Sequence, residues 1–266
     1  MIEAIHIDGK PLSNLKIGVF ITCLVDMFRP EIGFACLKLL EDAGCKLIIA
    51  PRLSCCGQPA YNAGDIPSAQ KVAAKAVAAL ADFDRIIVPS GSCAGMLSHH
   101  YPNLFEAGHP LHADAQKIAS KTRELSQFLY DECQFQPADT SIKGVAAYHD
   151  SCSSLREMKV DHQPRVLLQS QARLNVANIE RRESCCGFGG MFCVKYPEIS
   201  NKMVEDKTDA IKAIAPDYLL AGDLGCILNI AGKLSRQNSD IKAYHYAELL
   251  AFGDETPAIY DAKITN

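Results

Sequence analysis

Two pairs of adjacent cysteines, each followed by glycine, are the residues of this sequence whose types and spacing most directly suggest chemistry. The triplet Cys-Cys-Gly occurs at residues 55–57 and again at residues 185–187. Neighbouring cysteines close only a strained disulfide, and their side chains seldom share one buried direction. Glycine lets the backbone bend closely around whatever the sulfurs hold, because it has no side chain. The two triplets therefore predict a pair of metal sites.

Each triplet lies between two further cysteines, and the two sets are related by an almost constant offset. Cys152 follows Cys23 by 129 residues, the second triplet follows the first by 130, and Cys226 follows Cys93 by 133. Asp217 also follows Asp84 by 133 residues. Such self-similarity indicates an internal duplication. The expected metal ligands are Cys23, Cys55, Cys56 and Cys93 in the first half, and Cys152, Cys185, Cys186 and Cys226 in the second.

Four thiolates around one centre suit either zinc or an iron-sulfur cluster. Zinc sites commonly use two compact Cys-x-x-Cys pairs, whereas the first set here extends from Cys23 to Cys93. A vicinal pair also suits two metals of one cluster better than one small ion. The spacing therefore favours an iron-sulfur cluster in each half, with structural zinc as the alternative. Iron-sulfur clusters carry single electrons, so a redox role follows.

The overall composition is that of an ordinary globular protein of 266 residues, enough for one large or two modest domains. A net charge of −4 gives no basic footprint for nucleic acid. The apolar run at residues 17–25 is too short to span a membrane, and the N-terminus lacks a signal-peptide layout. We therefore expect a cytoplasmic protein, in which twelve cysteines indicate metal or thiol chemistry rather than disulfides.

The elements that must position these cysteines alternate between strand and helix. In the first half we expect strands at residues 16–22, 46–50 and 85–89, and a helix at 67–82. A second helix should begin near Pro30 and end at Gly44. Its inward residues are expected to be Phe34, Leu37, Leu40 and Ala43. Alternation of this kind predicts right-handed crossovers and a parallel sheet.

The second half repeats this order, with strands expected at residues 145–149, 174–179 and 218–221 and a helix at 198–214. An extra helix at 112–133 should close the first half, and a helix at 244–252 should precede a loose tail. The boundary is expected between residues 133 and 143, which gives modules 1–140 and 141–266.

The expected fold is α/β, with two tandem pseudo-repeat modules. Each module would be a small parallel, Rossmann-like sheet flanked by helices. Every expected ligand lies at or just beyond the carboxyl end of an expected strand, and such ends converge on one crevice.

These motifs resemble the cysteine-rich CCG-domain family, which includes the B subunit of heterodisulfide reductase and the iron-sulfur subunit of glycolate oxidase. The resemblance is more specific to the short, two-module iron-sulfur subunits of bacterial L-lactate utilisation complexes. It covers nearly the whole chain, and the chain lacks the closely spaced ferredoxin cysteines of longer relatives. The stretches that carry the resemblance are residues 55–64, 89–93, 148–152 and 184–199.

The resemblance implies an electron-transfer subunit that carries iron-sulfur clusters, here two four-iron clusters. It also implies two partner subunits, one of them with ferredoxin-type clusters, that together with this chain oxidise L-lactate to pyruvate without NAD. The substrate and the partners come from the resemblance alone, because cysteine spacing indicates only the clusters.

The sequence departs from the family pattern at the last cysteine of each module. Met96 and Asn229 occupy these positions, in Cys-Ala-Gly-Met and Cys-Ile-Leu-Asn. The heterodisulfide reductase subunit uses that fifth cysteine in unusual, non-cubane clusters, whereas four cysteines fit an ordinary cubane. A cluster-based disulfide reductase is therefore a weaker alternative, and a zinc-stapled scaffold protein is a further one.

The remaining cysteines have no partner under the repeat offset. Cys36 and Cys45 are expected to be small core residues, Cys133 has no assigned role, and Cys193 is a minor candidate for contact with the second cluster.

Several polar residues also have alternative interpretations. His149 is expected to orient the loop of Cys152, although a base beside a thiol nucleophile, or a proton carrier, is the alternative. The glycines of residues 187–190 are expected to let amide hydrogens reach sulfur. Lys195 and Tyr196 would face either a substrate anion or solvent. Three histidines are expected at the surface: His99, His100 and His162.

Overall fold

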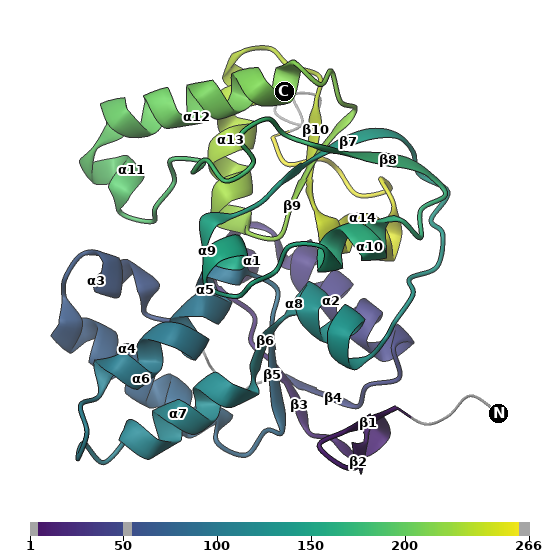
Figure 1. The fold of residues 1–266 in the computed structure, drawn as a ribbon. Coiled ribbons are helices and arrows are strands. Elements are labelled where there is room, and N and C mark those ends of the chain that lie inside the picture. Colours follow the sequence, from purple (N-terminus) through teal and green to yellow (C-terminus); the bar gives the residue numbers. More distant parts are fainter. Residues whose placement is uncertain (1–4, 50–54, 261–266) are drawn as a thin grey trace.

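The first half of the chain forms a four-stranded parallel sheet with helices on its faces (Figure 1). The computed structural model describes residues 5–49 and 55–260. The strands lie in the order β4 (Leu47–Ile49), β3 (Ile17–Val19), β5 (Arg85–Val88) and β6 (Thr122–Glu124). Ile17 is aligned with Leu47 on one side and with Arg85 on the other. Strand β3 is buried throughout, as expected for a strand covered on both faces.

The second half repeats this sheet, with its strands in the order β8 (Arg173–Asn178), β7 (Lys143–His149), β9 (Tyr218–Ala221) and β10 (Lys242–His245). All three pairings are parallel. In each half the first strand in the chain therefore lies between the second and the third, which is the flavodoxin-like order. The expected α/β fold of two tandem pseudo-repeats, with the cysteines beyond the carboxyl ends of strands, is confirmed.

Helices of the first half follow its strands and cover the sheet. They are α1 (Cys23–Phe28), α2 (Pro30–Asp42), α3 (Gln58–Asn62), α4 (Ile66–Leu80), α5 (Gly91–Gly95), α6 (Tyr101–Leu104), α7 (His112–Lys121) and α8 (Leu125–Gln127). Two π-helical turns extend α5 and α8, namely η2 (Met96–His100) and η3 (Phe128–Glu132). A small hairpin and a 3₁₀ turn precede them, formed by β1 (His6–Ile7), β2 (Lys10–Pro11) and η1 (Leu12–Asn14).

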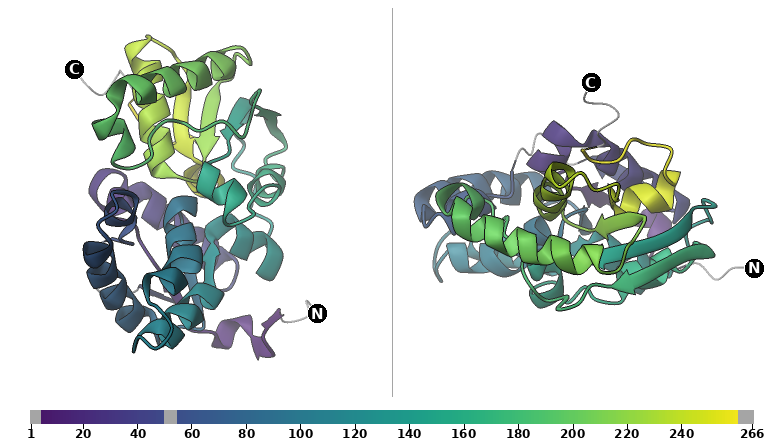
Figure 2. Two further views of the ribbon diagram at one scale, coloured as in Figure 1. Left: turned by 60° about the vertical axis from the view of Figure 1, so that its left-hand side comes forward. Right: turned by 90° about the horizontal axis from the view of Figure 1, so that it is seen from above.

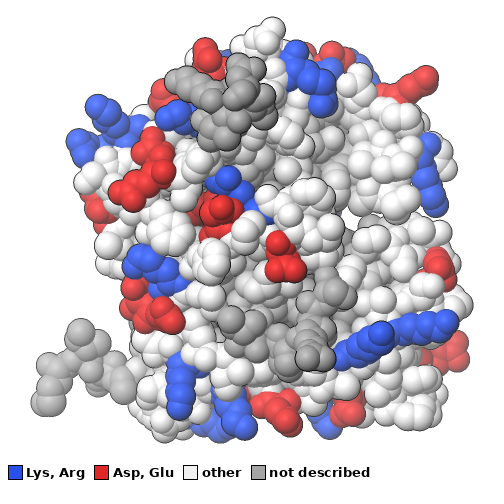
Figure 3. Space-filling model, turned by 180° about the vertical axis from the view of Figure 1, so that it is seen from behind, with Lys and Arg blue, Asp and Glu red and all other residues white. Residues whose placement is uncertain are grey.

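The helices of the second half are α9 (Cys152–Arg156), α10 (Gln163–Leu168), α11 (Phe192–Lys195), α12 (Pro197–Lys212), α13 (Leu224–Arg236) and α14 (Tyr246–Phe252). None of the helices that the structure describes is long and apolar enough to cross a membrane. Lysine and arginine are interspersed with acidic residues on the face shown in Figure 3.

Helix α2 begins at Pro30 as expected, but its buried face differs from the expected one. Phe34 is 64% exposed, so its expected inward position was wrong. The buried residues recur at i, i+3, i+4, i+7 and i+8, which is a complete helical stripe. Helix α2 buries this stripe, and not the one through Phe34, because this stripe faces both the sheet and α14. Its members are Ile32, Ala35, Cys36, Leu39 and Leu40.

The extra helix expected at residues 112–133 is interrupted, so this prediction was wrong. Helix α7 ends at Lys121, and β6 then pairs in parallel with β5 before the chain enters α8. In the second half, Tyr244 lies in β10 rather than in the helix that follows. Three- or four-residue strands have no periodicity that a sequence can display, and their pairing with a neighbouring strand decides the structure.

The expected loose tail is packed as far as the structure describes it. Ile259 forms an antiparallel bridge with Ala243, and Ala258 and Ile259 are both buried. Residues 261–266 lie outside the described part of the chain, as does Ala50, the last residue expected in the second strand.

The last helix of each half packs on the other half, as the views in Figure 2 allow the reader to follow. Helix α14 packs against α2, and α10 packs against α8 and η3. Polar contacts also join the two halves: the Tyr246 hydroxyl donates to Glu124 at the end of β6 over 2.8 Å, and Arg29 Nε donates to Glu248 over 2.8 Å. One hydrophobic cluster accordingly contains residues from both halves, including Leu40. The two sheets are therefore held as one body.

Candidate metal centres

Cys23 and Cys93 of the first set lie just beyond the carboxyl ends of β3 and β5. The strand order reverses between these two strands. Thr22 caps α1 and accepts from Val25 N–H over 3.5 Å, which places Cys23 at the first helical position. Ser90 likewise caps α5 and accepts from the N–H of Cys93 over 3.5 Å. Ligands of open parallel sheets bind at this reversal of strand order. The caps therefore direct both thiols toward the same crevice.

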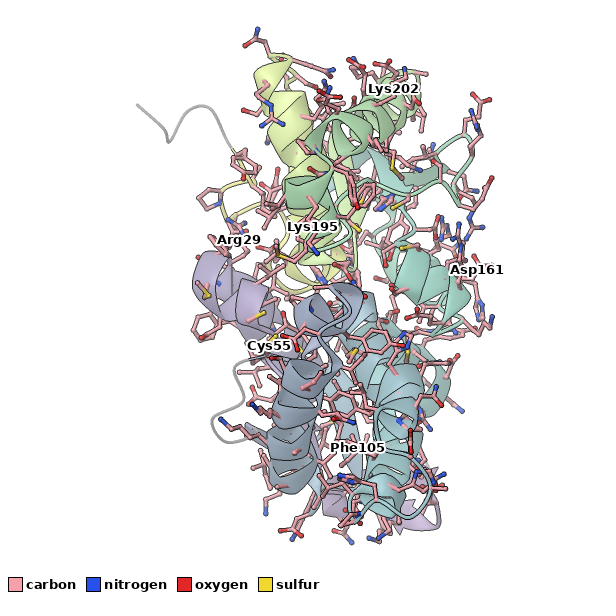
Figure 4. All side chains as sticks on the ribbon, turned by 90° about the vertical axis from the view of Figure 1, so that its left-hand side faces the viewer. Arg29, Cys55, Phe105, Asp161, Lys195 and Lys202 are labelled. Atoms are coloured by element: carbon pink, nitrogen blue, oxygen red, sulfur yellow. The ribbon has the colours of Figure 1, made fainter. Side chains whose placement is uncertain are left out.

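The vicinal pair of the first set brings the remaining two thiols to the same place. Cys23 and Cys55 have their sulfurs 4.0 Å apart, and those of Cys56 and Cys93 are 3.2 Å apart. Gly57 has a φ of +86°, a left-handed conformation that favours glycine, and its N–H donates to Cys55 Sγ over 3.3 Å. Figure 4 shows Cys55 near the level at which the two halves meet.

The second set is built in the same way. Ser151 caps α9 and accepts from Ser154 N–H over 3.2 Å, so that Cys152 begins the helix. The Cys186 and Cys226 sulfurs lie within 4.8 Å of each other. Cys152 interacts with Cys185, and this interaction raises the pKa of Cys152. The structure thus brings together all eight cysteines that the repeat singled out, four in each half.

Backbone amides reach the sulfurs of the second vicinal pair, as the glycine-rich loop led us to expect. The N–H groups of Gly187 and Phe188 donate to Cys185 Sγ and Cys186 Sγ over 3.4 and 3.5 Å. Gly187 and the next two glycines all have positive φ, which leaves the backbone free to wrap around the thiols.

Hydrogen bonding makes one cysteine of each pair the preferred thiolate. Donation from the thiols of Cys23 and Cys56, supported by the N–H of Gly57, lowers the pKa of Cys55 to about 2. The thiols of Cys152 and Cys186 lower the pKa of Cys185 in the same way. The same hydrogen bonds raise the pKa of the donor thiols of Cys23 and Cys152. Each set therefore holds one preferred thiolate, which is the form that binds metals, beside neighbouring thiols.

A cavity of about 170 Å³ adjoins the first set and is lined by both halves of the chain. The Cβ that an alanine would place at residue 225 lies 2.5 Å from the Phe188 ring, so Gly225 allows this ring to pack there. Lining residues from the first half include Cys23, Cys56 and Cys93, and those from the second include Phe188, Met191 and Asp223. The first set is therefore closed off by the second half.

The two positions that lack the family's last cysteine have structural roles. Met96 is fully buried in the hydrophobic cluster behind Cys93. Asn229 donates its side-chain amide to the carbonyl of Cys186 over 2.8 Å. The Tyr101 hydroxyl makes the corresponding bond to the carbonyl of Cys56, at 2.9 Å. Neither position supplies a fifth thiol, which argues against a cluster of the heterodisulfide reductase kind.

His149 lies at the end of β7, beside the second set. One of its ring nitrogens lies within 4.8 Å of the sulfurs of Cys186 and Cys226. Burial, assisted by the charge of Lys207, lowers the pKa of His149 to about 4, so the imidazole is neutral. The adjacent Asp150 is held by Arg165 and Arg182 rather than by the imidazole.

Three of the four other cysteines lie away from both sets. Cys36 and Cys45 are buried in the shared hydrophobic cluster as expected, together with Cys133. Cys193 lies in α11 and donates to the carbonyl of Gly190 over 3.3 Å.

Other expected site and surface residues are placed as follows. Lys195 and Tyr196 are exposed, as are His99 and His162. His100 was expected at the surface, and its side chain is 25% exposed there, where it packs on the Tyr61 ring and lies 3.3 Å from Glu157 of the other half.

Sequence reasoning missed two residues next to the cysteine sets. Asp223 occupies the position equivalent to the cap Ser90 under the 133-residue offset, so the repeat itself was a signal for it. Lys207 is only 1% exposed, although it belongs to an amphipathic helix in which a lysine is ordinarily solvated.

Comparison with known proteins agrees with this architecture. The sequence profile of the cysteine-rich CCG domain matches residues 17–98 and 146–231, one match in each half. Lactate utilization protein A of Bacillus cytotoxicus is 40% identical over 236 residues, which covers 89% of this chain and 98% of that protein. Lactate utilization protein A of Geobacillus kaustophilus is 41% identical over 236 residues, again covering 89% of this chain and 98% of that protein.

Among solved structures, a hypothetical protein from Helicobacter pylori superposes with a TM-score of 0.62 over 91% of this chain and 50% of that one. At 11% identity this likeness concerns the fold alone. The two profile matches and the full-length relatives lead to one conclusion: the chain belongs to the cysteine-rich CCG-domain family.

Proposed function

We propose that this chain is the iron-sulfur electron-transfer subunit of a cytoplasmic complex that oxidises L-lactate to pyruvate. The observation that carries the proposal is the duplicated set of four converging thiols, in a chain 40% identical to a lactate utilization protein A. Residues 1–140 and 141–266 would form its two modules. Its partners would be two further subunits, one of them with ferredoxin-type clusters.

Two four-iron clusters would suit this reaction because oxidation of lactate to pyruvate releases two electrons and two protons, and each cluster carries one electron. The first cluster would be held by Cys23, Cys55, Cys56 and Cys93, and the second by Cys152, Cys185, Cys186 and Cys226. The amides of Gly57, Gly187 and Phe188 already point at these sulfurs, and such hydrogen bonds favour the more negative, reduced cluster.

The spacing of the sulfurs favours a second candidate, a zinc-stapled scaffold. Zn–S bonds of about 2.3 Å in a tetrahedral site separate the sulfurs by about 3.8 Å. The separations of 3.2 and 4.0 Å in the first set are close to this value, whereas a four-iron cluster would require the thiols to move apart. The type and number of donors fit either centre, so metal analysis has to decide between them.

The deciding experiment is anaerobic purification with iron, acid-labile sulfide and zinc measured per chain. We expect about eight irons and eight sulfides. Cys56→Ser and Cys186→Ser should each lose about half of the iron and abolish electron flow from lactate in the reconstituted complex. Cys36→Ala, which removes a buried thiol outside both sets, is the matched control. Zinc without sulfide would replace the redox account by the scaffold, and full iron in both serine variants would refute the assigned ligands.

A further inference from the structure

We propose that His149 takes the place of one of the four thiols as a ligand of the second metal centre, so that this centre has mixed nitrogen and sulfur donors whereas the first has sulfur donors only. The inference rests on the proposed metal centres and concerns the second one alone. It holds for either iron or zinc, because both metals accept imidazole together with thiolate.

The position of the imidazole supports this assignment. His149 is 1% exposed, and one of its ring nitrogens lies within 4.8 Å of both Cys186 Sγ and Cys226 Sγ. Neither ring nitrogen has a hydrogen-bond partner among the described residues. A buried polar atom left unpaired is costly, so native structures almost always provide it with a partner. The adjacent thiols indicate that the partner is a metal.

The surroundings of His149 leave the ring available for this role. Its neighbour Asp150 would be the natural partner of an imidazole in a catalytic pair. Both carboxylate oxygens of Asp150 instead accept from Arg165 and Arg182, over distances of 2.7 to 3.2 Å.

The first half provides an internal comparison, because its sheet has the same register. Ile87 pairs with Val19, and the equivalent residue Leu220 pairs with Tyr148. The next residue along is Phe20 in the first half and His149 in the second. Phe20 is fully buried and offers no donor atom. The two halves therefore differ in donor type at one equivalent position, next to otherwise matched cysteine sets.

The experiment compares wild type with His149→Phe, which gives the second half the residue of the first. Protein labelled with ¹⁵N-histidine is purified anaerobically, reduced, and studied by pulsed EPR. We expect a histidine nitrogen coupling of through-bond strength in the wild type, its loss in His149→Phe, and its retention in the exposed control His99→Asn. His149→Gln replaces the phenylalanine variant if that variant does not fold. If the metal is zinc, cobalt(II) substitution gives the equivalent readout, as a shift of the visible bands on His149→Phe.

The outcomes separate this inference from the proposed function. Iron and sulfide in the expected amounts, with no histidine coupling in the wild type or with a coupling unchanged in both His149 variants, would overturn the ligand assignment alone. A protein that binds no metal would overturn both. Neither readout requires lactate or the partner subunits.

Discussion

The carboxylate of Asp223, in the second half, accepts a hydrogen bond from the backbone N–H of Ser92, in the first half, with the two atoms 2.9 Å apart. Asp223 precedes α13 but makes no capping bond to it, whereas the equivalent Ser90 caps α5. The buried carboxylate also accepts from the hydroxyl of Ser90 over 3.3 Å. One side chain thus ties the helix of Cys93 to the helix of Cys226.

Asp223→Ala should therefore destabilise both cysteine sets together. Hydrogen bonds to a charged group contribute about 1.5–3 kcal/mol each, and we expect a loss of about 2–3 kcal/mol in the free energy of unfolding. Asp223→Asn keeps an acceptor oxygen and should lose about half as much. Urea denaturation of the three proteins measures the difference, and an alanine variant as stable as wild type would contradict the role of this contact.

The glycines of the two Cys-Cys-Gly triplets should differ in their tolerance of alanine. Both have left-handed φ, at +86° for Gly57 and +83° for Gly187, which costs alanine about 1–2 kcal/mol. A Cβ at position 57 would lie 3.4 Å from a Val72 methyl, whereas one at 187 would lie 2.7 Å from the backbone oxygen of Ser200. Only the second contact forces backbone to move.

We therefore expect Gly57→Ala to lose about 1–2 kcal/mol of stability and to keep its metal. Gly187→Ala should lose more stability and should release the metal of the second centre preferentially. Metal content per chain and thermal unfolding of the paired variants provide the measurement. Equal losses from the two substitutions would show that space at position 187 does not matter.

A buried histidine outside the cysteine sets should make the fold sensitive to acid. His245 caps α14, with Nδ1 accepting from Ala247 N–H over 3.2 Å, and burial lowers its pKa to about 4. An unfolded histidine has a pKa of about 6.5, so between pH 4 and 6.5 the unfolded chain binds more protons than the folded one. The stability contribution is complete above pH 6.5 and is lost as the pH falls toward 4, by about 3 kcal/mol.

His245→Asn should flatten this pH dependence, because asparagine also caps helices but does not titrate. The comparison is made on metal-free protein by urea denaturation at pH 4.5, 5.5 and 7. His149 is buried as well and acts in the same direction, so the difference between wild type and variant isolates His245. His99→Asn, at an exposed site, is the control, and parallel curves for wild type and His245→Asn would exclude the mechanism.

The parts of the fold that the sequence predicted are those set by local pattern. Strand β9 was predicted with its observed bounds. The eight cysteines were placed at strand ends because the Cys-Cys-Gly triplets and the offset between the two halves can be read from the sequence alone. The parts that escaped prediction depend on contacts between residues far apart in the chain. Strand β6 exists through its pairing with β5, and Phe34 is exposed because the opposite stripe of α2 meets α14. The contact of His100 with Glu157 joins the two modules, 57 residues apart in the chain.

Lys207 is a buried cation near the second centre, and its counterpart in the first half is not a cation. Helices α4 and α12 begin 131 residues apart, at Ile66 and Pro197, so the counterpart of Lys207 is the fully buried Ala76. The ammonium donates to the carbonyl of Arg181 over 3.4 Å, and no described carboxylate pairs with it. Burial lowers the pKa of Lys207, while the thiols of Cys186 and Cys185 act in the opposite direction.

Lys207→Met should consequently lower the reduction potential of the second centre and leave that of the first unchanged. A nearby cation stabilises the more negative, reduced form of a cluster, and methionine fills similar volume without charge. Stability should be unchanged or higher, because an unpaired buried charge is costly. Lys202→Met, on the exposed face of the same helix (Figure 4), is the matched control. Redox titration followed by EPR resolves the two centres, and equal shifts in both, or none in the second, would show that Lys207 does not set their difference.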